Sequence, residues 1–114
     1  MIKSKQNSEH YTWGKNCDSW ILLNSESLSI KQEIIPPHSK EQLHFHKNAQ
    51  QFFFILKGKA TFIVDEEMFE VSENSGFHIT PNKNHLIENR LDVDLECLVI
   101  SNPSTNNDRF AVEN

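Results

Sequence analysis

The chain has 114 residues, 37% of them hydrophobic, and a formal net charge of −5 at pH 7. This length predicts one domain over residues 1–114, and an acidic balance without any Lys/Arg-rich run argues against nucleic acid or an anionic membrane surface as partners. No stretch approaches a transmembrane span, and residues 1–9 lack the apolar segment of a signal peptide.

The two cysteines, Cys17 and Cys97, form no metal-binding or redox motif. Two thiols so far apart in the chain do not make a disulfide framework either. We therefore expect buried, reduced thiols and a cytoplasmic setting.

Short strands separated by turns are predicted along most of the chain. A polar N-terminal arm is expected over residues 1–12, a barrel over 13–101 and a polar tail over 102–114. Within the barrel, strands are expected over residues 17–23, 28–35, 42–46, 51–56, 60–64, 68–71, 77–80, 85–88 and 95–100. No long stretch has helical periodicity, and many short strands broken by Gly, Pro and Asn indicate an all-β barrel or sandwich. A jelly-roll barrel is favoured, because it brings side chains from distant strands into one lumen.

A metal site is suggested by the spacing of His44 and His46. Side chains alternate along a strand, so both imidazoles would point to the same face while Phe45 points to the other. Imidazoles that share a cavity suit a divalent metal. Gln51, after a short loop, and His85, at the start of another strand, could complete the ligand set. Taken alone, a His-x-His pair is more often surface or a hydrogen-bonded core pair, and this alternative stays open.

Two stretches resemble the sequence motifs of the cupin superfamily. The first is carried by His44, His46, Gln51 and Gly58, and the second by Gly76, the run Ile79 to His85, and Asn89. The resemblance covers residues 36–89 and implies a cupin-type double-stranded β-helix with one divalent transition metal: Zn, Ni, Fe, Mn or Co. The implied metal ligands are His44, His46, Gln51 and His85.

Gln51 departs from the pattern, because the family usually has Glu at this position. Three imidazoles and one amide oxygen leave the full double positive charge on a metal, which favours an anionic substrate group or an enolate. The neutral amide also gives no acid–base function at neutral pH, so proton transfer must come from another group. The alternative is that Gln51 marks a site that has lost its function.

Two further residues are candidates for catalysis. His78, on the strand expected over 77–80, is a candidate for proton transfer, with a structural histidine as the alternative. Arg109, in the tail, could clamp a carboxylate or phosphate in bidentate fashion near the barrel mouth. The alternatives for Arg109 are a solvated charge or a salt bridge at the rim.

The strand over 51–56 predicts how the protein assembles. If Gln51 faces the lumen, then Phe53 and Ile55 face it too, and Phe52, Phe54 and Leu56 point outward. Such an apolar row needs a cover, for which the cupin resemblance favours a homodimer. The alternatives are cover by the second sheet of the same barrel or by the N-terminal arm.

Three functions follow from the resemblance. The first is a metal-dependent isomerase or lyase acting on a small sugar-derived or carboxylate-bearing metabolite. The second is a non-haem Fe(II) dioxygenase with a three-histidine site. The third is a cupin that binds a small molecule without catalysis.

Overall fold

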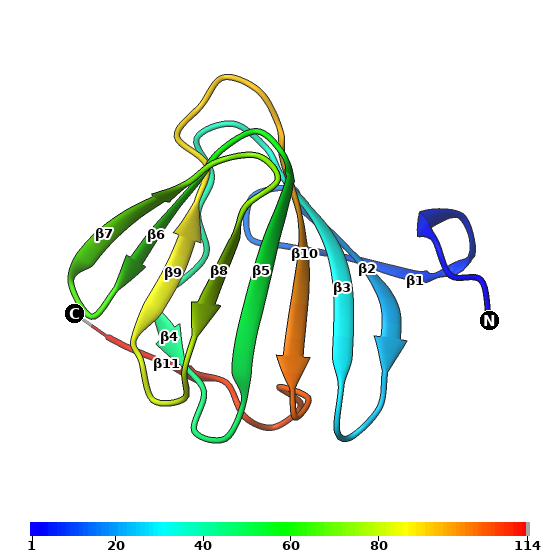
Figure 1. The fold of residues 1–114 in the computed structure, drawn as a ribbon. Coiled ribbons are helices and arrows are strands. Elements are labelled where there is room, and N and C mark those ends of the chain that lie inside the picture. The colour runs from blue at the N-terminus through cyan, green and yellow to red at the C-terminus, as the bar shows by residue number, and fades with distance from the viewer. Residues whose placement is uncertain (114) are drawn as a thin grey trace.

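The computed structural model describes residues 1–113 and is built almost entirely from β-strands (Figure 1). The elements in chain order are a short 3-10 helix η1 (Lys5–Asn7), β1 (Glu9–Trp13), β2 (Cys17–Asn24), β3 (Ser29–Ile35), β4 (His44–Phe45), β5 (Gln50–Lys57), β6 (Ala60–Val64), β7 (Glu67–Val71), β8 (Gly76–Ile79), β9 (His85–Glu88), β10 (Leu95–Asn102) and β11 (Phe110–Ala111). They form two antiparallel sheets, in the orders β1-β2-β3-β10-β5-β8 and β11-β4-β9-β6-β7. The predicted all-β jelly roll is confirmed.

No helix within residues 1–113 has the length and apolar character needed to cross a membrane.

The hydrophobic core lies between the two sheets. Phe53 from β5 meets Phe62 from β6 edge-on, with ring centroids 5.0 Å apart, and Phe62 stacks on Phe77 from β8 at 4.5 Å. Aromatic pairs in these geometries add stabilisation beyond the apolar area that they bury. The core therefore joins the two sheets through rings from β5, β6 and β8, and β5 also carries the predicted ligand Gln51.

Two turns in the motif regions show why the sequence needs particular residues there. Gly58, between β5 and β6, has φ +87°, and a Cβ atom at this position would lie 2.9 Å from the Asp94 carbonyl oxygen. Glycine is therefore required at this turn. Asn82, between β8 and β9, has φ +67°. Asparagine tolerates this left-handed conformation without a glycine.

The side-chain register of β5 agrees with the prediction. Gln51, Phe53 and Ile55 are buried between the sheets, whereas Phe52 is 40% exposed on the outer face and Phe54 is partly exposed. The homodimer that would cover this outer face stays a prediction.

In β3, most of the apolar residues mark the outer face of the sheet rather than the core. The apolar positions Leu28, Ile30 and Ile34 are only partly buried, whereas Ser29 and Glu33 are buried on the lumen side. The outer face of the six-stranded sheet is itself rich in apolar residues, so the apolar period in β3 marks the outside. The lumen side of β3 is consequently polar at Ser29 and Glu33, and apolar only at Ile35.

Both chain ends join the sheets, which differs from the expected arm and tail. Residues 9–12 belong to β1, the edge strand of the six-stranded sheet, which pairs with β2. Figure 1 shows it in blue, next to the chain end marked N. Lys5 lies over the Trp20 ring, 5.1 Å from its centroid, so the arm covers part of the outer face. At the other end, β11 pairs with β4, and the rings of Phe110 and Phe45 stack at 5.3 Å.

Candidate metal centre

Three histidines converge in the lumen. His44 lies in β4, His46 follows it directly, and His85 opens β9, where it is the pairing partner of His44. All three are buried, and one nitrogen of each lies within 4.8 Å of the others. Strand alternation predicted the shared face of His44 and His46, and strand pairing adds His85.

The hydrogen bonds of the three rings fix their tautomers. Nδ1 of His44 lies 2.7 Å from the Gln42 carbonyl oxygen, Nδ1 of His46 2.6 Å from that of Asp108, and Nδ1 of His85 2.8 Å from that of Lys83. A carbonyl oxygen can only accept, so each Nδ1 carries the hydrogen and donates it. Each Nε2 therefore presents a lone pair, which is the arrangement that backbone carbonyls give to metal-binding histidines.

The Nε2 atoms have few partners of their own. Nε2 of His46 is buried and has no hydrogen-bond partner among the described residues. A buried polar atom without a partner is costly, and a metal ion would satisfy this one. The residues present therefore fit a divalent transition metal.

Gln51 lies beside this cluster. Its Nε2 donates to the Ser101 hydroxyl oxygen at 3.0 Å, and its Oε1 lies 3.2 Å from Nε2 of His85. Two lone-pair atoms thus face each other, and a cation bound by both would relieve their repulsion. The structure places Gln51 next to the histidines, as predicted.

The imidazoles are neutral at pH 7. Burial lowers the pKa of His44 to about 3, and the neighbouring His85 and Arg109 add to this effect. Burial likewise lowers the pKa of His85 to about 4 and lowers that of His46, against the hydrogen bond to the Asp108 carbonyl. Neutral imidazole is the form that binds metals.

Asp108 supports the loop that carries His46, a role not predicted from the sequence. Its carboxylate accepts hydrogen bonds from the backbone N–H groups of Lys47 at 2.7 Å, Asn48 at 3.0 Å and Ala49 at 2.9 Å. Burial opposes ionisation of Asp108, but these three donors hold its pKa below the usual range. The tail residue thus sets both the ring orientation of His46 and the shape of the loop after it.

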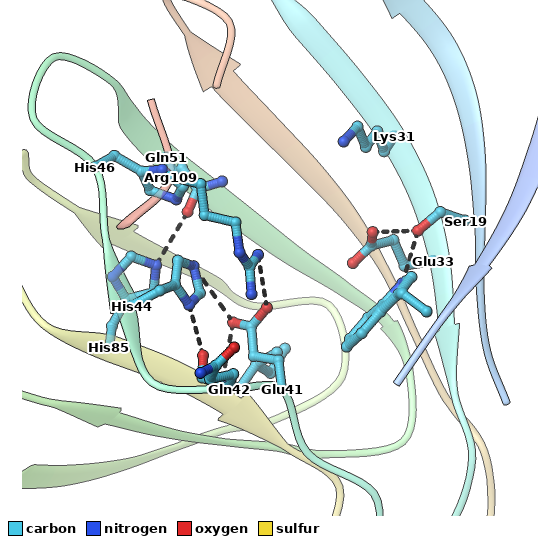
Figure 2. A network of polar contacts seen from close by, with 12 residues as sticks. Ser19, Lys31, Glu33, Glu41, Gln42, His44, His46, Gln51, His85 and Arg109 are labelled. Carbon is cyan, nitrogen blue, oxygen red and sulfur yellow. Dashed lines mark hydrogen bonds and ion pairs between the residues drawn. The ribbon is translucent and has the colours of Figure 1, made fainter. Parts of the chain in front are cut away.

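Glu41 and Arg109 flank the histidines (Figure 2). Glu41 Oε1 accepts from the Ile87 N–H at 3.2 Å and lies 4.0 Å from Nε2 of His44. Its Oε2 lies 3.8 Å from Nη1 of Arg109. Burial raises the pKa of Glu41 to about 8, although Arg109 acts in the opposite direction. Arg109 lines the cavity, and so does Glu41, for which the sequence carries no periodic or motif signal.

A cavity of about 500 Å³ opens from the histidines. Its wall includes the basic residues Lys31, Lys40 and Arg109 and the carboxyls of Glu33 and Glu41. Lys31 and Glu33 come from the polar lumen side of β3, which sequence reasoning had not found. The cavity thus combines lone-pair ligands, cations and carboxyls.

His78 is not part of this arrangement. It pairs with Phe52 across β5 and β8, so its side chain lies on the exposed outer face. Its Nε2 contacts the side-chain oxygen of Gln50 at 2.8 Å. The structure brings together His44, His46, Gln51, His85 and Arg109, and leaves His78 outside the cavity.

Two curated proteins are related to this sequence. An uncharacterised protein of Methanocaldococcus jannaschii is 36% identical over 75 residues, which are 66% of this chain and 60% of that protein. A mannose-1-phosphate guanylyltransferase of Salmonella muenchen is 24% identical over 106 residues, which are 87% of this chain but 22% of that enzyme. The chain thus spans less than two thirds of the length of either relative.

Solved structures with the same fold come from several bacteria. A Thermotoga maritima protein described as a predicted oxalate decarboxylase has a TM-score of 0.80 at 21% identity, covering 91% of this chain and 100% of its own. A Streptomyces nucleoside dehydratase has a TM-score of 0.82 at 14% identity, covering 99% and 91%. A sugar phosphate isomerase of Silicibacter pomeroyi has a TM-score of 0.76 at 16% identity, covering 91% and 76%.

The family assignment rests on the sequence and the fold together. The family model described as "Cupin domain" matches residues 31–101. This segment runs from β3 to β10 and includes all three clustered histidines. Because this match covers more than half of the chain, and the similar structures share its fold, the protein belongs to the cupin family.

Proposed function

We propose that the protein is a metal-dependent isomerase or lyase that acts on a small sugar-derived or carboxylate-bearing metabolite. The observation that carries the proposal is the convergence of three Nε2 lone pairs beside a cavity that is lined by His44, His46 and Arg109. His44, His46 and His85, with the amide oxygen of Gln51, would hold the metal. When bound, a divalent transition metal supplies a Lewis acid that polarises a substrate oxygen.

The charged residues of the wall favour an anionic ligand. Arg109 is 48% exposed on its side chain and lies 3.8 Å from Glu41, so it keeps donors free for a carboxylate or phosphate. Lys31 and Lys40 add positive charge around the same space. We therefore assign Arg109 the role of orienting the acidic group of the substrate, with its reacting carbons held toward the histidines.

Relatives of the fold support the class of reaction. The similar structures include a sugar phosphate isomerase and a nucleoside dehydratase, and a dehydratase is a lyase. Their sequence identities of 16% and 14% carry the fold only, so the substrate must be found by experiment.

The function is tested by turnover of defined probes. Protein loaded separately with Zn²⁺, Ni²⁺, Mn²⁺, Fe²⁺ or Co²⁺ is incubated in D₂O with aldose phosphates, hexuronates and unsaturated uronates, and products are followed by proton NMR. We expect deuterium incorporation or loss of water from one of these classes, and none with His46→Ala. Oxygen consumption by the Fe²⁺ form would support the dioxygenase instead. Tight ligand binding without turnover would support a binding protein.

Replacing His46 with Ala should abolish metal binding. The change removes one of the three lone pairs and leaves two imidazoles, which hold a metal far less tightly. We expect metal affinity to fall by at least about 100-fold, because loss of a group that only supports a ligand already costs about 10- to 100-fold. Calorimetric titration with Zn²⁺ measures it, with His78→Ala, an exposed histidine outside the cavity, as the matched control. Equal loss in both variants would contradict the site.

Replacing Gln51 with Glu should retain or tighten metal binding. A carboxylate adds a negative charge beside a divalent cation in a buried site, where electrostatic attraction is strong. The same titration compares Gln51→Glu with Gln51→Leu, which offers no ligand atom. Weaker binding by Gln51→Glu than by Gln51→Leu would show that the side chain does not face the metal.

Metal affinity should change little between pH 7.5 and pH 6.0. Three histidines with the ordinary pKa of about 6.5 would lose about 50-fold in affinity over this interval, because protons compete for their lone pairs. Here the pKa of His44 is lowered to about 3 and that of His85 to about 4, so the imidazoles stay neutral. Titration of the Glu41→Gln variant removes the nearby carboxyl from the comparison. A 50-fold loss would contradict the lowered pKa values.

A further inference from the structure

The buried carboxyl of Glu33 has no role in the function proposed so far. It projects from the lumen side of β3 into the cavity that His44 and His46 also line. Figure 2 shows it on the far side of Glu41 and Arg109 from the histidines. Glutamate side chains are almost never fully buried unless they are paired with another group. Glu33 therefore calls for an explanation.

Glu33 is held by a chain of donors from two other strands. Nε1 of Trp13 donates to the Ser19 hydroxyl oxygen at 2.9 Å, and the Ser19 hydroxyl donates to Oε2 of Glu33. The indole can only donate, so the lone pair of Ser19 is used and its proton is directed at Glu33. Within residues 1–113, no hydrogen bond reaches the other oxygen, Oε1, which is therefore free for a ligand.

The surroundings of Glu33 raise the pKa of its carboxyl. Burial raises the pKa of Glu33, and the Ser19 hydrogen bond, Lys31 and Arg109 act in the opposite direction. Glu41, across the cavity, is the other carboxyl whose pKa responds to Glu33. The groups packed around it also include the thiols of Cys17 and Cys97, which stay protonated because burial raises their pKa. Proton transfer is most efficient when the pKa of the group lies near the working pH.

We propose that Glu33 is the proton-transfer residue of the isomerase or lyase reaction, an inference that rests on the function proposed above. Gln51 carries an amide and cannot exchange a proton, and the geometry assigns this task to Glu33 on β3, two strands away in the same sheet. Ser19 and Trp13 are positioning residues. They act on the substrate only through Glu33.

A single carboxyl can both remove the proton and return it in the proposed step. The Glu33 carboxylate takes a proton from the carbon next to a substrate carbonyl, the C–H electron pair becomes a C=C bond, and the carbonyl π pair moves to oxygen as an enolate. In an elimination, the enolate re-forms the carbonyl, the C=C pair shifts to expel a β-hydroxyl, and that hydroxyl leaves as water with the proton from Glu33. The carboxylate is then restored. An isomerisation begins with the same proton removal.

A small epoxide tests the carboxyl without knowledge of the substrate. A carboxylate oxygen attacks an epoxide carbon of glycidol, the ring C–O bond breaks, and the alkoxide takes a proton from water, which leaves an ester. The full-length, Zn²⁺-loaded protein is treated with glycidol across a range of pH, and the ester is located by peptide mass spectrometry. We expect Glu33 to be labelled faster than any other carboxyl, and Glu33→Gln to lose this label.

The pH dependence separates a reactive group from a merely accessible one. We expect the labelling rate to rise with pH through the raised pKa of Glu33. In Ser19→Ala the profile should move to higher pH by about one unit, because a hydrogen bond that stabilises the carboxylate is lost. A label confined to surface carboxyls, to Glu41 or to the histidines would overturn the assignment. So would an unchanged profile in Ser19→Ala.

Turnover of the substrate found in the NMR screen completes the test. We expect Glu33→Gln to lower kcat by about 100-fold or more, within the range for loss of a general acid or base, with Zn²⁺ affinity unchanged. Glu33→Asp should restore part of kcat, and circular dichroism checks that each variant is folded. Full turnover by Glu33→Gln would overturn the proposal while the isomerase or lyase function stands. Protein that binds no metal would overturn the function itself.

Discussion

The donation of three ring N–H groups to backbone carbonyls is the interaction on which the site depends. It fixes each imidazole in one tautomer and turns each Nε2 lone pair toward a common point. His44 and His85 use the carbonyl two residues before them, so the irregular segment that leads into each strand supplies the acceptor. His46 differs, because its acceptor is Asp108, which is 62 residues away. The C-terminal segment is therefore part of the site.

Asp108 links the site to the fold through both its backbone carbonyl and its side-chain carboxylate. Its carbonyl orients His46, and its carboxylate accepts the N–H groups of the loop that leads into β5. Gln51 is the second residue of that strand, and the position of its amide depends on where the loop delivers it. The pairing of β11 with β4 holds this segment in place. One short stretch of tail thus sets two of the four proposed ligands.

Sequence reasoning found the residues whose position follows from strand alternation. His44 and His46 share a face because they are two residues apart, and the inward register of Gln51 follows from the alternation of β5. It missed Glu33 because Ile30 and Ile34 of β3 lie on the outer face, so the hydrophobic pattern of this strand indicates the wrong side as the core. Glu41 and Asp108 lie in irregular segments and act across long sequence separations, where no periodicity exists.

Two carboxyls, Glu41 and Glu33, lie near the proposed metal site but do not belong to the histidine cluster. Their own hydrogen-bond and charge partners explain why. Glu41 is held by the Ile87 N–H and by Arg109, at 3.2 Å and 3.8 Å, which keeps its carboxyl beside His44 rather than within the histidine cluster. Glu33 is held on the far wall by Ser19.

This separation has a consequence for ligand binding. The partly exposed pair of Arg109 and Glu41 is weak at 3.8 Å, so an incoming carboxylate or phosphate can replace Glu41 as the partner of Arg109. Glu41 would then lose the attraction to Arg109 that stabilises its ionised form, while burial continues to favour its protonated form. Glu33 would lose its weaker attraction to Arg109 as well, but it keeps the Ser19 hydrogen bond and the nearby Lys31, so it is the carboxyl better able to ionise once an anion is bound. The arrangement of charges therefore favours a division of labour in which Arg109 binds the acid group and Glu33 exchanges the proton.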